Sequence, residues 1–268
     1  MLAVAITSKV EAGNFRAAVH LLCSEETLAS NSDDTFEALK AKHPPAPQER
    51  RPAAEFKGNL RFSSLQVSSE DVIKTLRTFP AGSSGGPDGL TAQHVTDLLA
   101  GAPDEQLKTN LTDFVNIVLQ GELPTLVNEI LFGGRLIALQ TKDGGIRPIA
   151  VGYTLGCLVA KCVNAHVIKR RSDELQPMQV GVGVSGGAEA AVNAMQRLVT
   201  NVPDGHVVVK LDFSNAYNTI RRDSVLDTGA DKMPELYRFI HASLSGSPKY
   251  PTTPTLSNQL RDRNKGTF

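Results

Sequence analysis

Cysteine is scarce in this chain, and long apolar runs are missing. The 3 cysteines, Cys23, Cys157 and Cys162, include no Cys-x-x-Cys pair, which argues against a disulfide framework and against a zinc site. No window approaches the ~18 consecutive apolar residues of a membrane span, and Glu11 interrupts any signal-like start. We therefore expect no membrane partner and an intracellular protein, without a preference between nucleus and cytoplasm. Cys157 and Cys162 stand among apolar residues and are expected in the core.

The chain also lacks an excess of charge of either sign. Its 28 basic and 28 acidic side chains give a net charge of zero, so the charge of the whole chain does not predict a nucleic-acid partner. A hydrophobic content of 41% is ordinary for a globular protein. The length of 268 residues suffices for one large domain or two small ones. A site for a polyanion would therefore have to come from a local cluster of cations.

Proline marks the first boundary in the chain. Four prolines between residues 43 and 52 predict an extended linker, because proline lacks a backbone donor and restricts φ. We place this linker at residues 43–57, after a helical appendage at 1–42 that has no site chemistry of its own. Residues 58–250 form the expected main domain. Residues 251–268 are polar and contain proline, so we expect a disordered tail.

Helical periodicity dominates the main domain. Ser68 is followed three residues later by Asp71, a pattern that predicts a capping box at the start of a helix ending before Pro80. His166 falls on the apolar side of a later helix, where we expect a hydrogen-bonded core histidine. Further helices are predicted over residues 2–30, 35–41, 92–99, 104–120 with Gly121 as the stop, 154–171, 188–200 and 235–244.

A glycine-rich loop at residues 81–90 separates two of the expected helices. Such loops can bind phosphate, but this one lacks the Gly-x-x-x-x-Gly-Lys-Ser/Thr pattern, and no predicted strand precedes it. The preferred interpretation is a tight connection between two helices.

The hydrophobic period changes at residues 135–151. Two apolar segments flank Asp143-Gly144, which predicts a β-hairpin with its turn at this dipeptide. Lys142 and Arg147 lie near the predicted tip, and Pro148 is compatible with an edge strand. Two cations on a stiff hairpin can bind a multiply charged anion. They can also merely keep an edge strand soluble, and the sequence favours neither interpretation.

A second apolar stretch, at residues 207–211, predicts a strand buried inside a sheet. Four of its five residues are apolar and three of these are β-branched. Asp212 follows directly, with Phe213 next and Tyr217 five positions after the carboxylate. A carboxylate at the end of a buried strand can hold a metal ion beneath a substrate. It can equally cap the following turn or helix.

Taken in order, three of these segments resemble the reverse transcriptase family, especially the enzymes of non-LTR retrotransposons. Residues 85–89 (Gly-Gly-Pro-Asp-Gly) resemble an early motif of the family, and the hairpin at 142–149 resembles the fingers motif. Residues 211–217 (Leu-Asp-Phe-Ser-Asn-Ala-Tyr) resemble the first palm motif. The resemblance implies the fingers and partial palm of a right-hand polymerase. Its fold would be mixed α/β (α+β) and helix-rich, with a small antiparallel sheet and a β-hairpin.

The resemblance also implies a role for each matching residue. Asp212 and the backbone carbonyl of Phe213 would bind Mg²⁺, which prefers hard oxygen ligands. Lys142 and Arg147 would neutralise the triphosphate of an incoming dNTP. Tyr217 would pack under the sugar and exclude a ribose 2′-hydroxyl. The implied reaction is RNA-directed DNA polymerisation, a template-directed nucleotidyl transfer to the DNA 3′ end of an RNA or DNA template–primer by a two-metal mechanism.

The later palm motif of the family, a strand with two adjacent aspartates, has no counterpart after Asp212. The Asp33-Asp34 pair precedes the other motifs and lies in a polar run. The glycine-rich motif between the palm motifs and the thumb are also missing, so we expect a domain truncated after the first palm motif. A partial palm sheet would expose an apolar edge that is prone to association.

Two interpretations of function therefore stay open. In the first, the chain is an incomplete reverse transcriptase domain. In the second, it is a catalytically inactive remnant that at most binds nucleic acid or a partner. A nucleotide-binding enzyme of another class would rest on the glycine loops alone.

Overall fold

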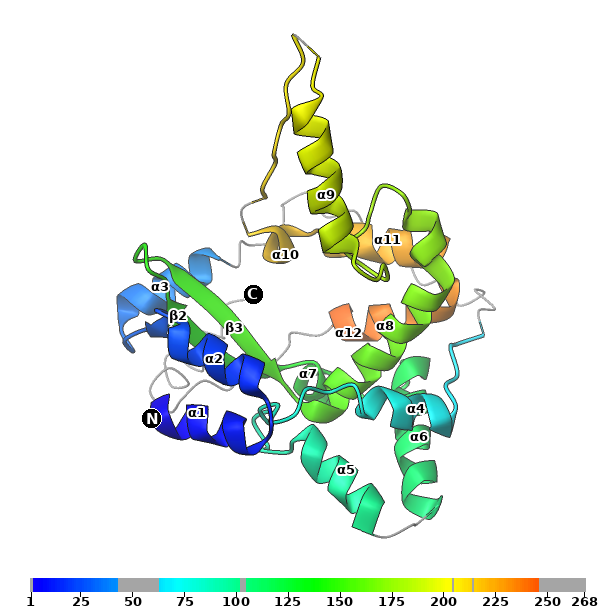
Figure 1. Cartoon of the computed structure of the whole chain (residues 1–268). Coiled ribbons are helices and arrows are strands. Elements are labelled where there is room, and N and C mark those ends of the chain that lie inside the picture. Colours follow the sequence, from blue (N-terminus) through cyan, green and yellow to red (C-terminus); the bar gives the residue numbers. More distant parts are fainter. Residues whose placement is uncertain (1, 43–62, 102–104, 204, 214, 246–268) are drawn as a thin grey trace.

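The computed structural model describes residues 2–42, 63–101, 105–203, 205–213 and 215–245. The predicted linker at 43–57 and the predicted tail at 251–268 lie outside these residues. In chain order the elements are α1 Leu2–Glu11, α2 Phe15–Cys23, β1 Thr27–Leu28, α3 Asp33–Ala41, α4 Ser69–Leu76, α5 Ala92–Gly101, α6 Glu105–Gln120, α7 Thr125–Leu131, β2 Gly134–Gln140, β3 Ile146–Gly152, α8 Thr154–Leu175, α9 Gly187–Thr200, α10 Ala216–Thr219, α11 Arg222–Lys232, the 3₁₀ turn η1 Pro234–Leu236, and α12 Tyr237–Ser245. Figure 1 shows α1 to α3 gathered around the hairpin and a separate group of helices beside them. The fold is therefore α+β and helix-rich with a small antiparallel sheet, as predicted.

The sheet is three-stranded and antiparallel, with the order β1-β2-β3. Its β2–β3 hairpin pairs from Gly134 opposite Gly152 to Gln140 opposite Ile146, and Gly144 in the turn has a φ of +79°. Pro148 lies on β3, which is an edge strand of the sheet. Proline is tolerated there because an edge strand has a free side that needs no N–H donor. The predicted hairpin is confirmed. The third strand, β1, comes from the N-terminal segment, which therefore extends the sheet.

The hydrophobic core lies between helices rather than on the sheet. Helices α4, α6 and α8 pack on one another, and α12 contacts α6 and α7. The buried cluster consists of Leu65, Val72, Leu76, Ala92, Val95, Val115, Val118, Leu119, Leu158, Val159, Cys162, Leu236 and Phe239. These side chains recur at helical spacing along each element, so burial of one face per helix holds this part of the molecule together.

Local sequence signals are realised at several helix ends. Ser68 and Asp71 form the predicted capping box at the start of α4. Gly121 has a φ of +69° directly after α6, as a glycine stop requires. The helix predicted over residues 2–30 is interrupted at Gly13, whose φ of +71° separates α1 from α2. Helices α7, α10 and α11 were not predicted.

One of the two cysteines expected in the core is not there. Cys162 is buried, and burial raises the pKa of its thiol. Cys157 is exposed. The reason is geometric, because both residues lie on α8 and a spacing of five residues at 100° each puts them about 140° apart.

The strand predicted at residues 207–211 is absent, which corrects the sequence interpretation. These residues form neither helix nor strand, and Val207, Val209 and Leu211 are exposed. Helix α9 leads away from the body, and the chain returns from its tip through residues 205–213 (Figure 1). We call α9 and this return segment the arm. A buried strand needs neighbouring strands and covering layers, and the sheet of the described chain is built elsewhere.

None of the described helices combines the length and the apolar character needed to cross a membrane.

Candidate functional site

The two cations of the hairpin already have carboxylate partners. The Nζ of Lys142 lies 2.8 Å from Oε2 of Glu25, and Nη1 of Arg147 donates to Oε1 of Glu26. Both glutamates directly precede β1, so the pairing of β1 with β2 brings them to the hairpin. Exposed ion pairs contribute only about 0–1 kcal/mol. A stronger anion can therefore displace these carboxylates at small cost.

The turn of the hairpin carries a third charge. The hydroxyl of Thr141 and the backbone amide of Asp143 lower the pKa of the Asp143 carboxyl, and the nearby charges of Arg147 and Lys42 lower it further. Asp143 is therefore an anion at neutral pH, within range of the charges of Arg147 and Lys42. The tip carries charges of both signs, which reduces its attraction for a polyanion.

The glycine-rich loop packs against the base of the hairpin. A Cβ on Gly86 would lie 2.8 Å from the carbonyl oxygen of Gly152, so only glycine permits this approach. The hydroxyl of Thr154, the first residue of α8, donates to the carbonyl of Leu90. The loop is thus a tight connection between α4 and α5, as the preferred interpretation predicts. It places the segment at 85–89 against the end of β3, beyond the 142–149 segment that resembles the fingers motif.

The third segment lies on the arm and at its base. Phe213 exposes 76% and Tyr217 exposes 94% of its surface, and Asp212 is also exposed. Asn215 adopts a φ of +56°, and its Nδ2 donates to the carbonyl oxygen of Lys42 at 2.6 Å. This bond ties the base of the arm to the end of α3. The described residues form no packed surface around Tyr217 that could hold a sugar.

The residues of the candidate site are not assembled into one centre. Among the residues that the structure describes, no hydrogen bond or ion pair joins Lys142 or Arg147 to Asp212. The described residues also contain no group of three His, Cys, Asp or Glu side chains that could hold a metal ion. Asp212 and the Phe213 carbonyl therefore do not by themselves fit the ligand set of a two-metal centre.

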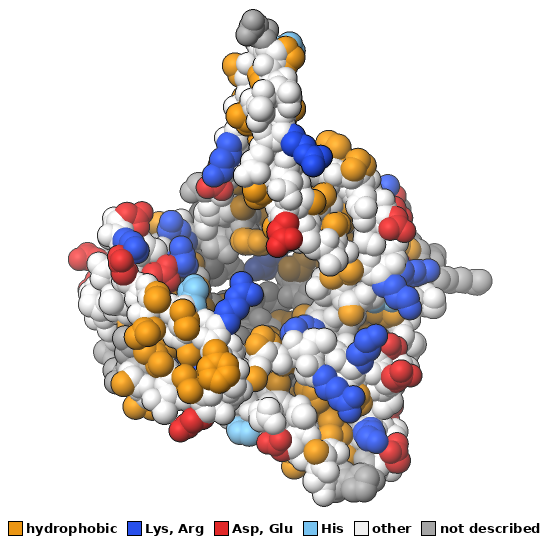
Figure 2. All heavy atoms as spheres, in the orientation of Figure 1, with side chains coloured by type: hydrophobic (Ala, Val, Ile, Leu, Met, Phe, Trp, Pro, Cys, Tyr) orange, Lys and Arg blue, Asp and Glu red, His pale blue; other side chains and the backbone are white. Residues whose placement is uncertain are grey.

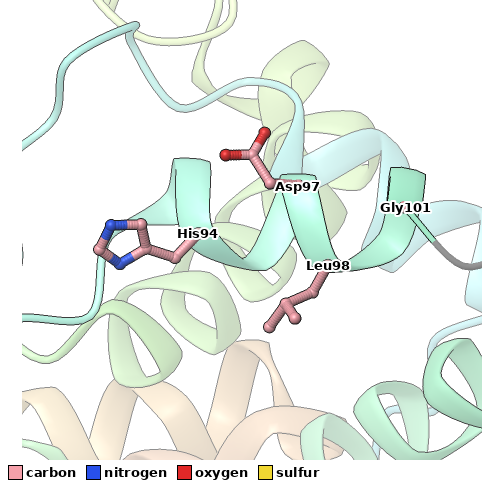
Figure 3. A pocket seen from close by; sticks show the side chains of 4 residues that line it. All are labelled: His94, Asp97, Leu98 and Gly101. Atoms are coloured by element: carbon pink, nitrogen blue, oxygen red, sulfur yellow. The ribbon is translucent and has the colours of Figure 1, made fainter.

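Two hollows occur elsewhere on the surface, and neither contains a predicted site residue. One, of about 530 Å³, is lined by His94, Asp97, Leu98 and Gly101. Figure 3 shows that the side chains of His94 and Asp97 point in different directions, and Asp97 accepts a hydrogen bond from Gln93. The other, of about 480 Å³, lies over α1, α2 and Pro80. Without converging polar groups, the first hollow lacks the chemistry of a binding site.

A polar cluster on α8 was only partly anticipated. His166 is half-buried, and its Nε2 lies 3.5 Å from Oε1 of Glu235, which also pairs with Nη1 of Arg170 at 3.2 Å. A distance of 3.5 Å is long for a hydrogen bond, so the buried Nε2 has no good partner in the described chain. The prediction of a fully hydrogen-bonded core histidine is therefore wrong in this respect. No sequence pattern indicated Glu235 as its neighbour.

Sequence reasoning also missed Glu25 and Glu26, the partners of the hairpin cations. Two adjacent acids before a two-residue strand are too common a pattern to indicate a role. Comparison of the chain with models of protein families, with curated proteins and with solved structures found no match. The resemblance to the reverse transcriptase family therefore rests on the three sequence segments and on their order along the chain alone.

Proposed function

We propose that this chain is a reverse-transcriptase-like module, comprising fingers and the first part of a palm, that binds template–primer nucleic acid and a nucleotide. Template-directed nucleotidyl transfer to a DNA 3′ end is the reaction that the resemblance implies. The hairpin carries the proposal, because it holds Arg147 on β3, opposite Leu139 of β2, and Lys142 in the turn that joins the two strands.

The packing at the base of the hairpin supports this proposal. The Gly86 approach to Gly152 and the Thr154 hydrogen bond to Leu90 fix the loop at 85–90 against the hairpin. A rigid connection of this kind keeps charged side chains in place, so less conformational entropy is lost on binding. Nucleotide phosphates would meet the two cations after displacing Glu25 and Glu26.

Catalysis would need carboxylates beyond those that the described residues bring together. Asp212 supplies one, and its exposed position leaves it accessible. We therefore assign Asp212, Phe213 and Tyr217 to a nucleotide site that is incomplete in the described residues. We propose no step through a metal ion.

A second candidate function is that of a non-catalytic remnant that binds nucleic acid or a partner. It is favoured by one observation: the described residues leave Asp212 without a neighbouring carboxylate cluster while the basic hairpin is intact. The two candidates share the binding step and differ only in nucleotidyl transfer.

The test combines binding with primer extension. A fluorescent DNA primer on an RNA template is titrated with the protein at several salt concentrations, with and without Mg²⁺ and dNTP. We expect Lys142→Ala and Arg147→Ala each to reduce affinity for the template–primer. Each should also reduce by about one the magnitude of the slope of log affinity against log salt concentration. Lys169→Ala, an exposed cation on α8, is the matched control and should leave both unchanged.

Primer extension then separates the two candidates. Extension that is lost in Asp212→Ala and kept in Asp97→Ala supports the polymerase. Binding without extension supports the remnant. Equal affinity of the wild type, Lys142→Ala and Arg147→Ala would contradict both, because the hairpin would then not contact the nucleic acid.

A further inference from the structure

The arm presents an apolar segment whose backbone has no hydrogen-bond partner among the described residues. No hydrogen bond between described residues involves the backbone of residues 207–213. Figure 2 shows the arm standing clear of the body on the face in view, with hydrophobic side chains along it. Unpaired N–H and C=O groups beside exposed apolar side chains form a template for an added strand.

All residues from 207 to 213 are exposed, and the apolar residues at odd positions are more exposed than Val208. Val207, Val209, Leu211 and Phe213 expose 84, 70, 76 and 76% of their surfaces, whereas Val208 exposes 43%. In an extended chain, alternate side chains share a side. The odd-numbered residues thus make one apolar face, while Lys210 and Asp212 fall on the opposite side.

The segment is complementary to itself when reversed. If two copies pair antiparallel with Leu211 opposite Leu211, then Val209 lies opposite Phe213 on both sides of the centre. Lys210 then lies opposite Asp212 twice, which gives two cross-strand pairs of opposite charge. All five positions from 209 to 213 therefore meet a residue of matching chemistry.

We propose that the arm is a self-association element, and that two copies of this chain pair antiparallel through residues 209–213. The pairing gives backbone N–H and C=O groups of both arms hydrogen-bond partners. It also brings the odd-numbered apolar side chains of the two copies next to one another. A two-fold axis through Leu211 makes the contact closed, as is usual for homodimers. This proposal does not rest on the proposed function.

The charge pattern favours a second copy over an unrelated strand. Any apolar strand could cover the odd-numbered face. Only a strand with an acid and a base in the reversed order would also match Lys210 and Asp212, and the chain itself carries that order. Like charges directly opposite each other destabilise a strand pair, so the pattern also disfavours a parallel arrangement in register.

The test exploits this pattern through charge exchange. Sedimentation equilibrium of the full chain over a concentration series measures the dimer constant. Lys210→Asp gives like charges at both cross-strand positions, and so does Asp212→Lys. Each single variant should weaken the dimer and raise its Kd by on the order of tenfold. An equimolar mixture of the two should restore association, because each strand then meets its opposite charge.

Two further variants complete the design. The double variant Lys210→Asp with Asp212→Lys should dimerise like the wild type. Lys169→Asp, which makes the same charge change on α8, should leave association unchanged. Because the exchanged side chains are exposed, circular dichroism and Tm should show an intact fold in all variants.

Restoration in the mixture and in the double variant supports the proposal. A wild type that stays monomeric at all accessible concentrations overturns it and leaves the arm to a different partner. Association that survives both single variants also overturns it, and would point to another apolar surface, such as the exposed Phe15, Val19 and Leu22 of α2.

Discussion

The ammonium of Lys142 lies 2.8 Å from a carboxylate oxygen of Glu25 and thereby joins the tip of the hairpin to the segment before β1. The neighbouring Arg147–Glu26 pair repeats this connection. An N-terminal segment that looks separate in the sequence thus shields the cations that the hairpin offers to an anion.

Removing the acidic partners should increase the affinity of the hairpin for nucleic acid. We expect Glu25→Gln and Glu26→Gln each to tighten binding of the template–primer by up to about fivefold, because an exposed pair is worth about 0.2–1 kcal/mol. Fluorescence titration at fixed salt measures the change. Glu105→Gln, which removes the partner of Lys108 at 2.7 Å on α6, is the control. Unchanged affinity in both hairpin variants would argue against this site.

Gly86 tests the docking of the loop on the hairpin. Gly86→Ala would place a Cβ 2.8 Å from the backbone of Gly152 and Tyr153, and such overpacking costs about 1–3 kcal/mol. We expect chemical denaturation to show this loss of stability. Gly101→Ala meets no atom within 4 Å and should be neutral or slightly stabilising. Equal stability of the two variants would show that loop and hairpin are not in contact.

Truncating a side chain in the helical core should lower the free energy of unfolding strongly, whereas truncating one on the arm should not. Leu158 is fully buried on α8, whereas Leu198 on α9 exposes 53% of its surface. Leu158→Ala is expected to lower the free energy of unfolding by about 2–5 kcal/mol. Leu198→Ala should change it by no more than about 0.5 kcal/mol. Urea unfolding followed by circular dichroism compares them, and a large loss in Leu198→Ala would mean that α9 is packed.

The capping box of α4 should contribute measurably to the free energy of unfolding. The Ser68 hydroxyl accepts a hydrogen bond from the Asp71 amide at 3.1 Å, and hydrogen bonds from the side chain and backbone of Ser68 lower the pKa of the Asp71 carboxyl. Ser68→Ala should therefore cost about 0.5–2 kcal/mol in urea unfolding at neutral pH. Ser69→Ala is the control and should cost less than about 0.5 kcal/mol.

Glu235 should make stability depend on pH. Burial raises the pKa of this carboxyl, but its own backbone amide, His166 and Arg170 together outweigh burial and lower the pKa. A lowered pKa in the folded state stabilises above the unfolded value of about 4.3, and this contribution is lost as pH falls through the folded pKa. The free energy of unfolding is measured from pH 7 to pH 3 for the wild type and for Glu235→Gln. It should fall less steeply with decreasing pH in the variant, which lacks this carboxyl. Parallel curves for variant and wild type would contradict the prediction.

Much of the helical architecture could be predicted because its signals are local. The capping box, Gly121 and the Asp143-Gly144 turn each act through a few neighbouring residues, and each lies where expected. The prediction for Cys157 failed because an apolar neighbourhood in sequence does not define one face of a helix. The three segments of the candidate site could be named from the sequence, but their mutual placement could not, since long-range packing determines it.

The sequence by itself determined most of the helices, the hairpin and the self-complementary order of residues 209–213, because these follow from periodicity, turn chemistry and charge order. Only the tertiary structure decided that Glu25 and Glu26 face the hairpin cations and that the loop at 85–90 packs on the hairpin. It also decided that the apolar stretch before Asp212 is exposed on an arm. A strand is buried only when other strands and helices cover it, and those partners lie far away in sequence or in another chain.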